Sequence, residues 1–495
     1  MDPRDGLRES LSGRLSRRTL LRGGVGTGTG LLAAAVLAAC GGASPVPTAP
    51  PPAAPAPTAL AKGGAEAPKP AAPAATTAPL AAATTAPAAA ATAAPAAQSA
   101  PAKGQVEIEI GSYFDAGPRF DFINKTLDKF HQDNPGVKTK FEPVPSAQYW
   151  DKMQVRLAGG TAPDVLIGSG STFLNFAEKG AWGEVDTYLK SDKSFNLDDY
   201  YKQADIFGWQ GKQYGLPFMQ NVTIFLYNKK LFKEGGVDEP TDKWTWDTLL
   251  ESAKKLTRPG QFGLRIDDGF EFNWLTFIWS NGGEYIAKDL TKTTLDMPET
   301  IEAFQWLVDL KIKHKISPPV GDTSLGQGDP WMTGRIAMQT AGTGGIGNWV
   351  AGIKDFEWDL FPVPGHPKTG RRVVSSNGNP YLLVKQSKYP DQAWLLVKHL
   401  AGPFTQGVIG ETKIAMPTLI ARATDPGSYL RTPPASMKLT DTNMKMSRDL
   451  QFHKNWLNWY NEITKQMKLA FSGEKTVAEA AKLANTEGDR IIRSS

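Results

Sequence analysis

Large apolar residues first become frequent near residue 106, and from there their positions follow two patterns in turn, one typical of strands and one typical of helices. Residues 106–110 alternate apolar and polar, which predicts a strand, and residues 119–134 place apolar side chains at helical spacing. A second strand is predicted at 137–143, a second helix at 149–157 and a buried strand at 165–167. Strand–helix alternation of this kind predicts an α/β fold with a mostly parallel sheet and helices on its faces.

The stretch 214–232 has the clearest pattern of all. It begins with a Gly and a Pro, passes through the uncharged polar pair Gln220 and Asn221, and becomes an apolar, β-branched and aromatic run at 222–227. Such a run, bounded by a turn and by Asn228, predicts a buried strand.

The same alternation continues to the end of the chain. Amphipathic helices are predicted over 300–314, 391–400 and 474–492, and strands over 335–340 and 373–384. The chain has 495 residues, which is too long for one ordinary domain and predicts two or three compact units.

The N-terminal residues carry a pattern of a different kind. A positively charged segment with Arg17 and Arg18 precedes an apolar run at 31–39 that is too short to span a bilayer. This pattern predicts an export signal over 1–39. The paired arginines resemble a twin-arginine signal, with the general secretory route as the alternative.

Cys40 is the one cysteine of the chain, and it follows Leu-Ala-Ala directly. This context resembles a bacterial lipobox, in which the cysteine is diacylated; the alternative is a cleaved signal with an incidental cysteine. Two acyl chains anchor a protein stably where one does not. The rest of 40–104 is almost entirely Ala, Pro and Thr, which predicts a disordered tether because large apolar residues are missing.

Charge and composition exclude several classes of function. The formal net charge is +5, and residues 1–39 hold six Arg against three Asp or Glu, so the remainder is close to neutral. A nucleic-acid partner is therefore not expected, because it requires clustered Lys and Arg. One cysteine excludes an intramolecular disulfide. The five histidines show no metal-ligand spacing, so neither a metal nor a cofactor is predicted.

Several segments together resemble a known family. They are AGGTAPDVLIGSGSTFLNFAEKGAW at 158–182, GKQYGLPFMQN, LYNKKLFKEGGV, WTWDTLLESAKKLT, FIWSNGGEYI, WMTGRIAM and IKDFEWDLFPVPG. Their order and spacing resemble extracellular solute-binding proteins of family 1, the maltose-binding-protein-like lipoproteins of sugar ABC transporters. The resemblance implies a two-lobed periplasmic-binding-protein-like fold of type II, with a hinge between the lobes.

The resemblance also implies how the chain divides. The stretch 214–232 is then the crossover from the first lobe to the second. The first lobe is expected to hold 105–216 and about 325–373, and the second 217–324 and about 374–495. Crossings between the lobes are expected near Leu216, near 321–328 and near 374–377.

Candidate site residues are polar or aromatic side chains expected at loop ends that face one cleft. Ligands of parallel sheets bind outside the carboxyl ends of the strands, and neutral amides and hydroxyls suit sugar hydroxyls. The family commonly has a stacking tryptophan where this sequence has Gly344. The predicted ligand-binding residues are Tyr113, Ser169, Ser171, Gln220, Asn221, Asn273, Trp279, Asn348 and Asn377.

These features predict a membrane-tethered, extracytoplasmic solute-binding component of an ABC importer. It is expected to be a monomer on the outer face of the cell membrane, to capture a mono- or oligosaccharide by hinge closure, and to deliver it to the permease. The alternatives are an exported glycoside hydrolase with two carboxylates, or a binding protein for a polyol or a glycerol phosphodiester. No catalytic motif or phosphate loop appears, so an enzyme is not predicted. A surface adhesin would have repeats, and none is visible.

Overall fold

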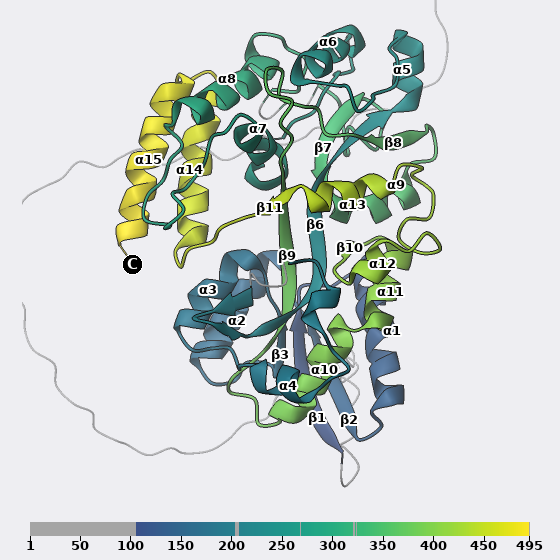
Figure 1. Cartoon of the computed structure of the whole chain (residues 1–495), viewed down its shortest axis with the longest axis vertical. Helices are drawn as coiled ribbons and strands as arrows, with labels where there is room; N and C mark the ends of the chain where they lie inside the picture. Colours follow the sequence, from purple (N-terminus) through teal and green to yellow (C-terminus); the bar gives the residue numbers. More distant parts are fainter. Residues whose placement is uncertain (1–104, 203–206, 268, 320–321, 323, 495) are drawn as a thin grey trace, which may run out of the picture. The chain divides into compact units, whose positions relative to one another are not determined.

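A computed structural model describes residues 105–202, 207–267, 269–319, 322 and 324–494, and these lie in one compact unit (Figure 1). The predicted export signal, Cys40 and the predicted tether lie outside the described residues. Within the described ranges, every helix is too short or too polar to cross a membrane.

The predicted strand–helix alternation at the start of the folded part is confirmed. Strand β1 lies between β2 and β3 and pairs in parallel with both. The strands are parallel because each intervening helix carries the chain back to the end of the sheet at which the strands begin. The elements are β1 (Val106–Ser112), α1 (Gly117–Asp133), β2 (Val137–Pro143), α2 (Ser146–Ala158), β3 (Val165–Ile167) and α3 (Gly170–Glu178).

Two long strands run through the middle of the molecule, β6 (Gly215–Asn228) and β9 (Val374–Leu383). They are antiparallel, and the sheet order is β10-β6-β9-β3-β1-β2. The far half of β6 leaves this sheet and pairs with β7 (Met338–Gly342) and β8 (Trp358–Phe361). The strand predicted at 222–227 is therefore the second half of a much longer one.

Two separate hydrophobic cores define the two lobes. The first core draws on residues between 108 and 219 and between 381 and 419. The second draws on residues between 222 and 374 and between 423 and 484, together with Tyr201 and Met416. The chain accordingly changes core three times: within β6, within β9 and between Met416 and Ala423.

This division corrects the lobe boundaries predicted from the sequence. The segment 325–373 packs in the second core rather than the first, and residues 381–419 pack in the first rather than the second. One crossing lies near 416–423 and not near 321–328. The hydrophobic pattern identifies a strand but not the sheet it joins: β7 pairs with the second-lobe half of β6, and the end of β9 pairs with β3.

The remaining elements complete the two lobes. Predicted helices and strands other than β6 end within three residues of the observed bounds. The first lobe adds α4 (Asp186–Ser191), η1 (Leu197–Asp199), β4 (Gly208–Trp209), β5 (Lys212–Gln213), α10 (Pro390–Ala401), α11 (Pro403–Thr412), β10 (Met416–Pro417) and α12 (Ile420–Ala423). The second adds α5 (Lys229–Gly235), α6 (Trp246–Leu256), η3 (Phe270–Trp274), α7 (Leu275–Ser280), α8 (Pro298–Ile312), η4 (Thr343–Gly345), α9 (Ile346–Gly352), α13 (Lys438–Lys445), β11 (Ser447–Asp449), α14 (Trp456–Phe471) and α15 (Val477–Arg493).

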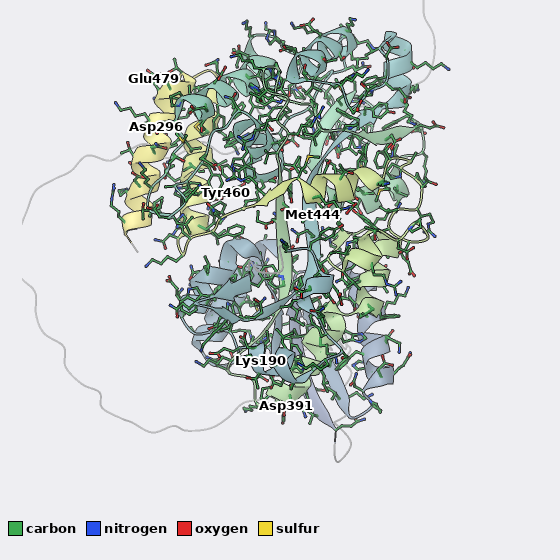
Figure 2. All side chains as sticks on the ribbon, in the orientation of Figure 1. Lys190, Asp296, Asp391, Met444, Tyr460 and Glu479 are labelled. Atoms are coloured by element: carbon green, nitrogen blue, oxygen red, sulfur yellow. The ribbon has the colours of Figure 1, made fainter. Side chains whose placement is uncertain are left out.

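Charged side chains lie on the outer surfaces of both lobes (Figure 2). Lys190 and Asp391 are exposed on the first lobe, and Asp296 and Glu479 on the second. Glu479 also closes a capping box with Thr476 at the start of α15, which satisfies backbone N–H groups there.

Candidate ligand-binding cleft

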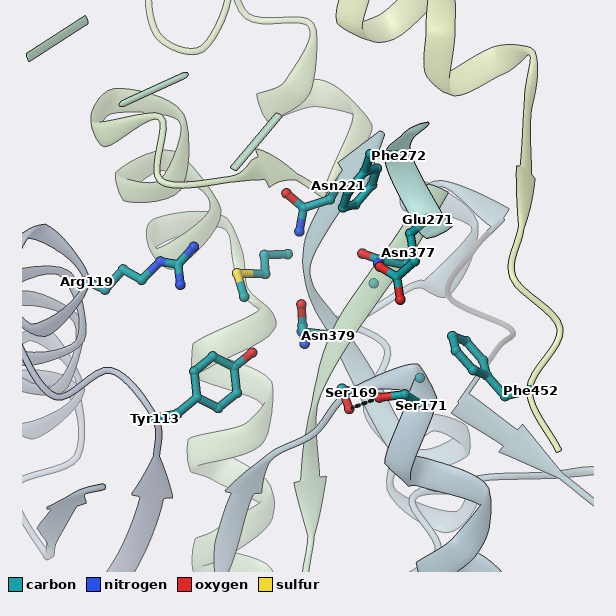
Figure 3. Close-up of a pocket in the computed structure, with 13 residues that line it drawn as sticks. Tyr113, Arg119, Ser169, Ser171, Asn221, Glu271, Phe272, Asn377, Asn379 and Phe452 are labelled. Carbon is teal, nitrogen blue, oxygen red and sulfur yellow. Dashed lines mark hydrogen bonds between the residues drawn. The ribbon is translucent and has the colours of Figure 1, made fainter. Parts of the chain in front are cut away.

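A cavity of about 300 Å³ lies where the two lobes face each other (Figure 3). Strands β6 and β9, which both lobes share, supply the residues between its two walls. The described residues that line it are Tyr113, Arg119, Ser169, Gly170, Ser171, Met219, Asn221, Glu271, Phe272, Asn377, Gly378, Asn379 and Phe452.

The first-lobe wall consists of hydroxyl groups at the carboxyl ends of parallel strands. Tyr113 follows β1, and Ser169 and Ser171 follow β3. The Ser169 Oγ lies 2.9 Å from the Ser171 Oγ, so these hydroxyls orient each other. Burial raises the pKa of Tyr113 above its ordinary value, so its phenol remains neutral. This wall offers uncharged donors and acceptors, together with the Arg119 guanidinium from α1.

The residues between the walls come from paired positions of β6 and β9. Asn221 lies opposite Asn377 in the strand register, and both line the cavity. The Asn379 Nδ2 donates to the Gly168 carbonyl oxygen at 2.9 Å, which fixes the loop that carries Ser169. Side chains alternate along a strand, so Gln220 points away from the side that Met219 and Asn221 share. Gln220 is 2% exposed and lines none of the described cavities.

The second-lobe wall is aromatic and carries one carboxylate. Glu271 and Phe272 lie in η3, a π-helical turn, a feature often found at functional sites. The Phe272 ring covers Gly342, where a Cβ would lie only 3.0 Å from it. Phe452 comes from the loop before α14 and packs against Gly170 of the first lobe, where a Cβ would overlap its ring. Glycine at 170 therefore allows the two walls to touch.

Glu271 is the titratable group whose pKa is most relevant to this cavity. Its Oε2 accepts a hydrogen bond from the Asn377 Nδ2 at 2.5 Å. Burial raises the pKa of Glu271 to about 7, and the Asn377 bond opposes that shift only in part. Near neutral pH the carboxyl group is therefore divided between its protonated and ionised forms.

Two further cavities adjoin the main one. One, of about 310 Å³, shares Ser171, Glu271 and Phe272 with it and extends to Trp456 and Tyr460. The other, of about 340 Å³, shares Tyr113 and Arg119 and extends past Gly344 to Asn348 and Ile414. The three cavities together form a groove longer than the main cavity alone.

The structure brings together most of the residues predicted for the site. Tyr113, Ser169, Ser171, Asn221 and Asn377 line the main cavity, which was the arrangement expected of loop ends on one sheet edge. Asn273 lines the cavity beyond Glu271, where its Oδ1 also accepts from the Thr340 hydroxyl. Asn348 lines the cavity beyond Arg119.

Trp279 and Gln220 are the predicted residues that lie elsewhere. Trp279 is 1% exposed in the second core, its Nε1 donates to Glu284, and the Arg448 guanidinium lies 4.5 Å from its ring centroid. Trp279 was predicted to bind the ligand, and this prediction is wrong because every residue of α7 is buried in the second core. Gln220 is corrected because the alternation of β6 turns it away from the cleft.

Several lining residues were not predicted from the sequence. Glu271 and Phe272 belong to an aromatic run whose pattern is typical of a buried core helix. The acidic residue inside that run is the signal that could have identified them as site residues. Arg119 stands near the start of α1, directly after the loop that carries Tyr113. Met219, Asn379 and Phe452 have no pattern that distinguishes them. In the described part of the chain, no three His, Cys, Asp or Glu side chains gather to hold a metal ion.

Comparisons with known proteins agree with this architecture. The family model for bacterial extracellular solute-binding proteins matches residues 117–406. A putative binding protein of Brucella abortus is 26% identical over 311 residues, 61% of this chain and 73% of that protein. An arabinooligosaccharide-binding protein of Halalkalibacterium halodurans is 23% identical over 289 residues, 56% of this chain and 64% of that protein.

Solved structures show the same fold. The structure of an ABC substrate-binding protein from Listeria monocytogenes in complex with cycloalternan aligns with a TM-score of 0.71 and 25% identity. The alignment covers 79% of this chain and 99% of that one. The predicted two-lobed α/β fold is thereby confirmed.

Proposed function

The chain belongs to the bacterial extracellular solute-binding protein family, and from this premise we propose that it captures an oligosaccharide for an ABC importer. The observation that carries the proposal is the cleft itself. Its first-lobe wall offers neutral hydroxyls and its second-lobe wall offers aromatic rings. Sugars present hydroxyls at their edges and apolar faces on their rings, so both walls have a matching surface on such a ligand.

The length of the groove favours an oligosaccharide over a monosaccharide. A ligand confined to the main cavity would leave two adjoining cavities of similar volume unfilled. The relative from Halalkalibacterium halodurans is named for an arabinooligosaccharide, and the structure from Listeria monocytogenes contains cycloalternan. Both names are consistent with an extended saccharide in the cleft of this protein.

Capture proceeds by closure of the two lobes. A ligand that contacts both walls stabilises the closed arrangement over the open one, because only the closed form makes both sets of contacts. The three segments that connect the lobes, in β6, β9 and 416–423, are where the hinge acts. The closed protein then presents its ligand to the transmembrane subunits of a permease.

The cleft has no need of catalysis for this role. Hydrolysis of a glycosidic bond ordinarily uses two carboxylates that flank it. Among the described residues that line the three cavities, the carboxylates are Glu271 and Asp115, and no one of these cavities is lined by both. Incubation with the bound oligosaccharide should leave it intact, as judged by chromatography, and the appearance of shorter products would favour the enzyme instead.

A lipid anchor at Cys40 completes the proposal. The export signal over 1–39 carries the chain out of the cytoplasm, and the stretch 40–104 tethers the monomer to the outer face of the membrane. Cys40→Ala should move the protein into the soluble fraction, because two acyl chains supply the membrane affinity. Ser44→Ala is the matched control and should stay with the membrane. A membrane-bound Cys40→Ala protein would contradict the anchor.

A thermal-shift screen tests the proposed function. Its panel should hold oligosaccharides, the corresponding monosaccharides, polyols and glycerol phosphodiesters. A ligand at a hundred times its Kd stabilises the native state by about 2.7 kcal/mol, so binders raise the melting temperature. We expect oligosaccharides to give the largest shifts. A panel in which only non-sugar solutes shift the melting temperature would contradict the proposal.

A further inference from the structure

The Glu271 carboxylate lies where the main cavity meets the cavity that extends to Trp456 and Tyr460. In the described structure its side chain accepts one hydrogen bond, from the neutral Asn377 amide. No described Lys, Arg or His forms an ion pair with it. A carboxylate withdrawn from water in this way is costly to ionise unless a cation accompanies it.

Aromatic rings surround this carboxylate. Figure 3 shows Glu271 between Phe272 and Phe452, and the adjoining cavity adds the rings of Trp456 and Tyr460. The face of an aromatic ring attracts a cation held above it. A carboxylate among aromatic rings is a combination that favours a positively charged group.

The groups that face Glu271 from neighbouring elements do not supply that positive charge. Burial raises the pKa values of Tyr285 and Tyr460, so both phenols stay neutral. Asp449 of β11 accepts a hydrogen bond from the Ser376 hydroxyl, and Ser376 precedes Asn377 on β9, so its side chain points to the opposite face of that strand.

None of the described cations of the region forms an ion pair with Glu271. Arg448 of β11 is held by Glu284 through two hydrogen bonds of 2.9 and 3.0 Å. Arg119 lines the main cavity from the first lobe, and its guanidinium carbon lies 5.4 Å from the Phe114 ring centroid. Arg265 pairs with Asp267 and Asp329. Since none of these cations pairs with Glu271, a cationic group on a ligand in the cavity would supply the counter-charge that this carboxylate lacks.

We propose that Glu271 recognises a protonated amine on the bound saccharide, so that the ligand is an amino-bearing oligosaccharide. This inference rests on the proposed function and adds the chemical class of the ligand to it. The ammonium group donates to the free Glu271 oxygen and lies against the rings of the second-lobe wall. Ser171, which lines both cavities, contacts a neutral part of the same sugar.

Three β-1,4-linked trisaccharides that differ only at C2 test the amine directly. They are the glucosamine trimer, cellotriose with a hydroxyl, and the N-acetylated trimer. Calorimetric titration at pH 7 should show about 10- to 100-fold tighter binding of the glucosamine trimer than of cellotriose, the range expected for a charge-assisted hydrogen bond. Glu271→Gln should abolish that preference, whereas the matched variant Ser171→Ala should keep it while weakening all three ligands.

The pH dependence separates recognition of charge from a structural role. The pair requires an ionised Glu271 and a protonated amine, so affinity for the glucosamine trimer should pass through a maximum between the pKa of Glu271, about 7, and the pKa of the amine. Affinity for cellotriose should vary little over the same range. If Glu271 only supports the wall, Glu271→Gln would weaken the three ligands equally and change no pH profile.

The outcomes distinguish this inference from the proposed function. Equal or tighter binding of cellotriose by the wild-type protein overturns the amine and leaves an oligosaccharide-binding protein. The same conclusion follows if the glucosamine trimer fails to bind while any neutral saccharide from the thermal-shift panel does bind. If no saccharide of either kind binds, both the inference and the proposed function are wrong.

Discussion

The two walls of the cleft are built in different ways and offer a ligand different chemistry. The first-lobe wall uses the hydroxyls of Tyr113, Ser169 and Ser171, which follow the ends of parallel strands, and the guanidinium of Arg119 from α1. The second-lobe wall uses Glu271 and Phe272 from a π-helical turn, with Phe452 from a loop. One wall makes directional hydrogen bonds, and the other provides ring surface and one titratable charge.

This difference predicts that the polar groups of the cleft determine specificity and that the aromatic wall contributes most of the affinity. Neutral polar groups in an enclosed site discriminate well, because a ligand without the matching hydroxyl leaves them unpaired. Ring faces contribute binding energy to many ligands without distinguishing them strongly. Substitutions in the second-lobe wall should therefore have larger effects than substitutions among the neutral polar residues.

The largest expected effect comes from removing the charge of the second-lobe wall. The pKa of Glu271 is 4.5 in its ordinary state and about 7 in the folded protein. Between these two pH values, Glu271 holds a proton in the native state that the unfolded chain has released. The free energy of unfolding therefore falls by up to about 3 kcal/mol as pH rises through this range. Glu271→Gln avoids the loss and should be more stable than wild type at pH 8.

Urea unfolding of the ligand-free protein at pH 4.5 and pH 8 measures this effect. Near pH 4.5 the two proteins should have closely similar midpoints, since Glu271 is then protonated in the native state. Glu178→Gln, at an exposed glutamate on α3, is the matched control and should follow wild type at both pH values. A Glu271→Gln protein no more stable than wild type at pH 8 would show that this wall does not strain its carboxylate.

The next effect in size concerns the ring surface of the same wall. Phe272→Ala should weaken oligosaccharide binding by about 1–3 kcal/mol, by analogy with bases stacked on aromatic side chains, or roughly 5- to 150-fold. Calorimetric titration measures the change. Phe404→Ala, at an exposed phenylalanine on α11, should bind like wild type. Unchanged affinity of the Phe272→Ala protein would show that the aromatic wall does not contribute to oligosaccharide binding.

A smaller effect is expected from the polar residues between the walls. Asn221→Ala should cost about 0.5–1.5 kcal/mol of binding free energy, the value of one hydrogen bond. The melting temperature of the free protein should change little, because the Asn221 side chain is only half-buried and lines the cavity. Titration and thermal unfolding of the same preparation separate the two quantities. Wild-type affinity in a well-folded Asn221→Ala protein would place the ligand away from β6.

The two walls also differ in how far the sequence predicts them. Tyr113, Ser169 and Ser171 were predictable because polar residues directly after parallel strands meet at one sheet edge. Glu271 and Phe272 were not, because an aromatic run at near-helical spacing resembles a core helix and nothing local identifies a π-helical turn. The same run led to Trp279, whose side chain is packed in the core.

The lobe boundaries failed for a related reason. The helices and strands that the sequence predicts lie close to their observed places, since hydrophobic periodicity determines them locally. The core that each returning segment joins depends on long-range pairing, such as that of Val165 with Leu383 or of Tyr227 with Met338. No pattern within β7 or β9 encodes that choice, so the segments 325–373 and 381–419 were exchanged.

A crystal structure of the protein with the tightest-binding oligosaccharide tests the central claim most directly. We expect the saccharide to lie in the cleft, with its hydroxyls hydrogen-bonded to Ser169 or Asn221 and one ring face stacked on Phe272. It also predicts that the ligand extends past Glu271 or Arg119 into an adjoining cavity. A saccharide bound outside the cleft, or one that contacts a single lobe only, would contradict the account.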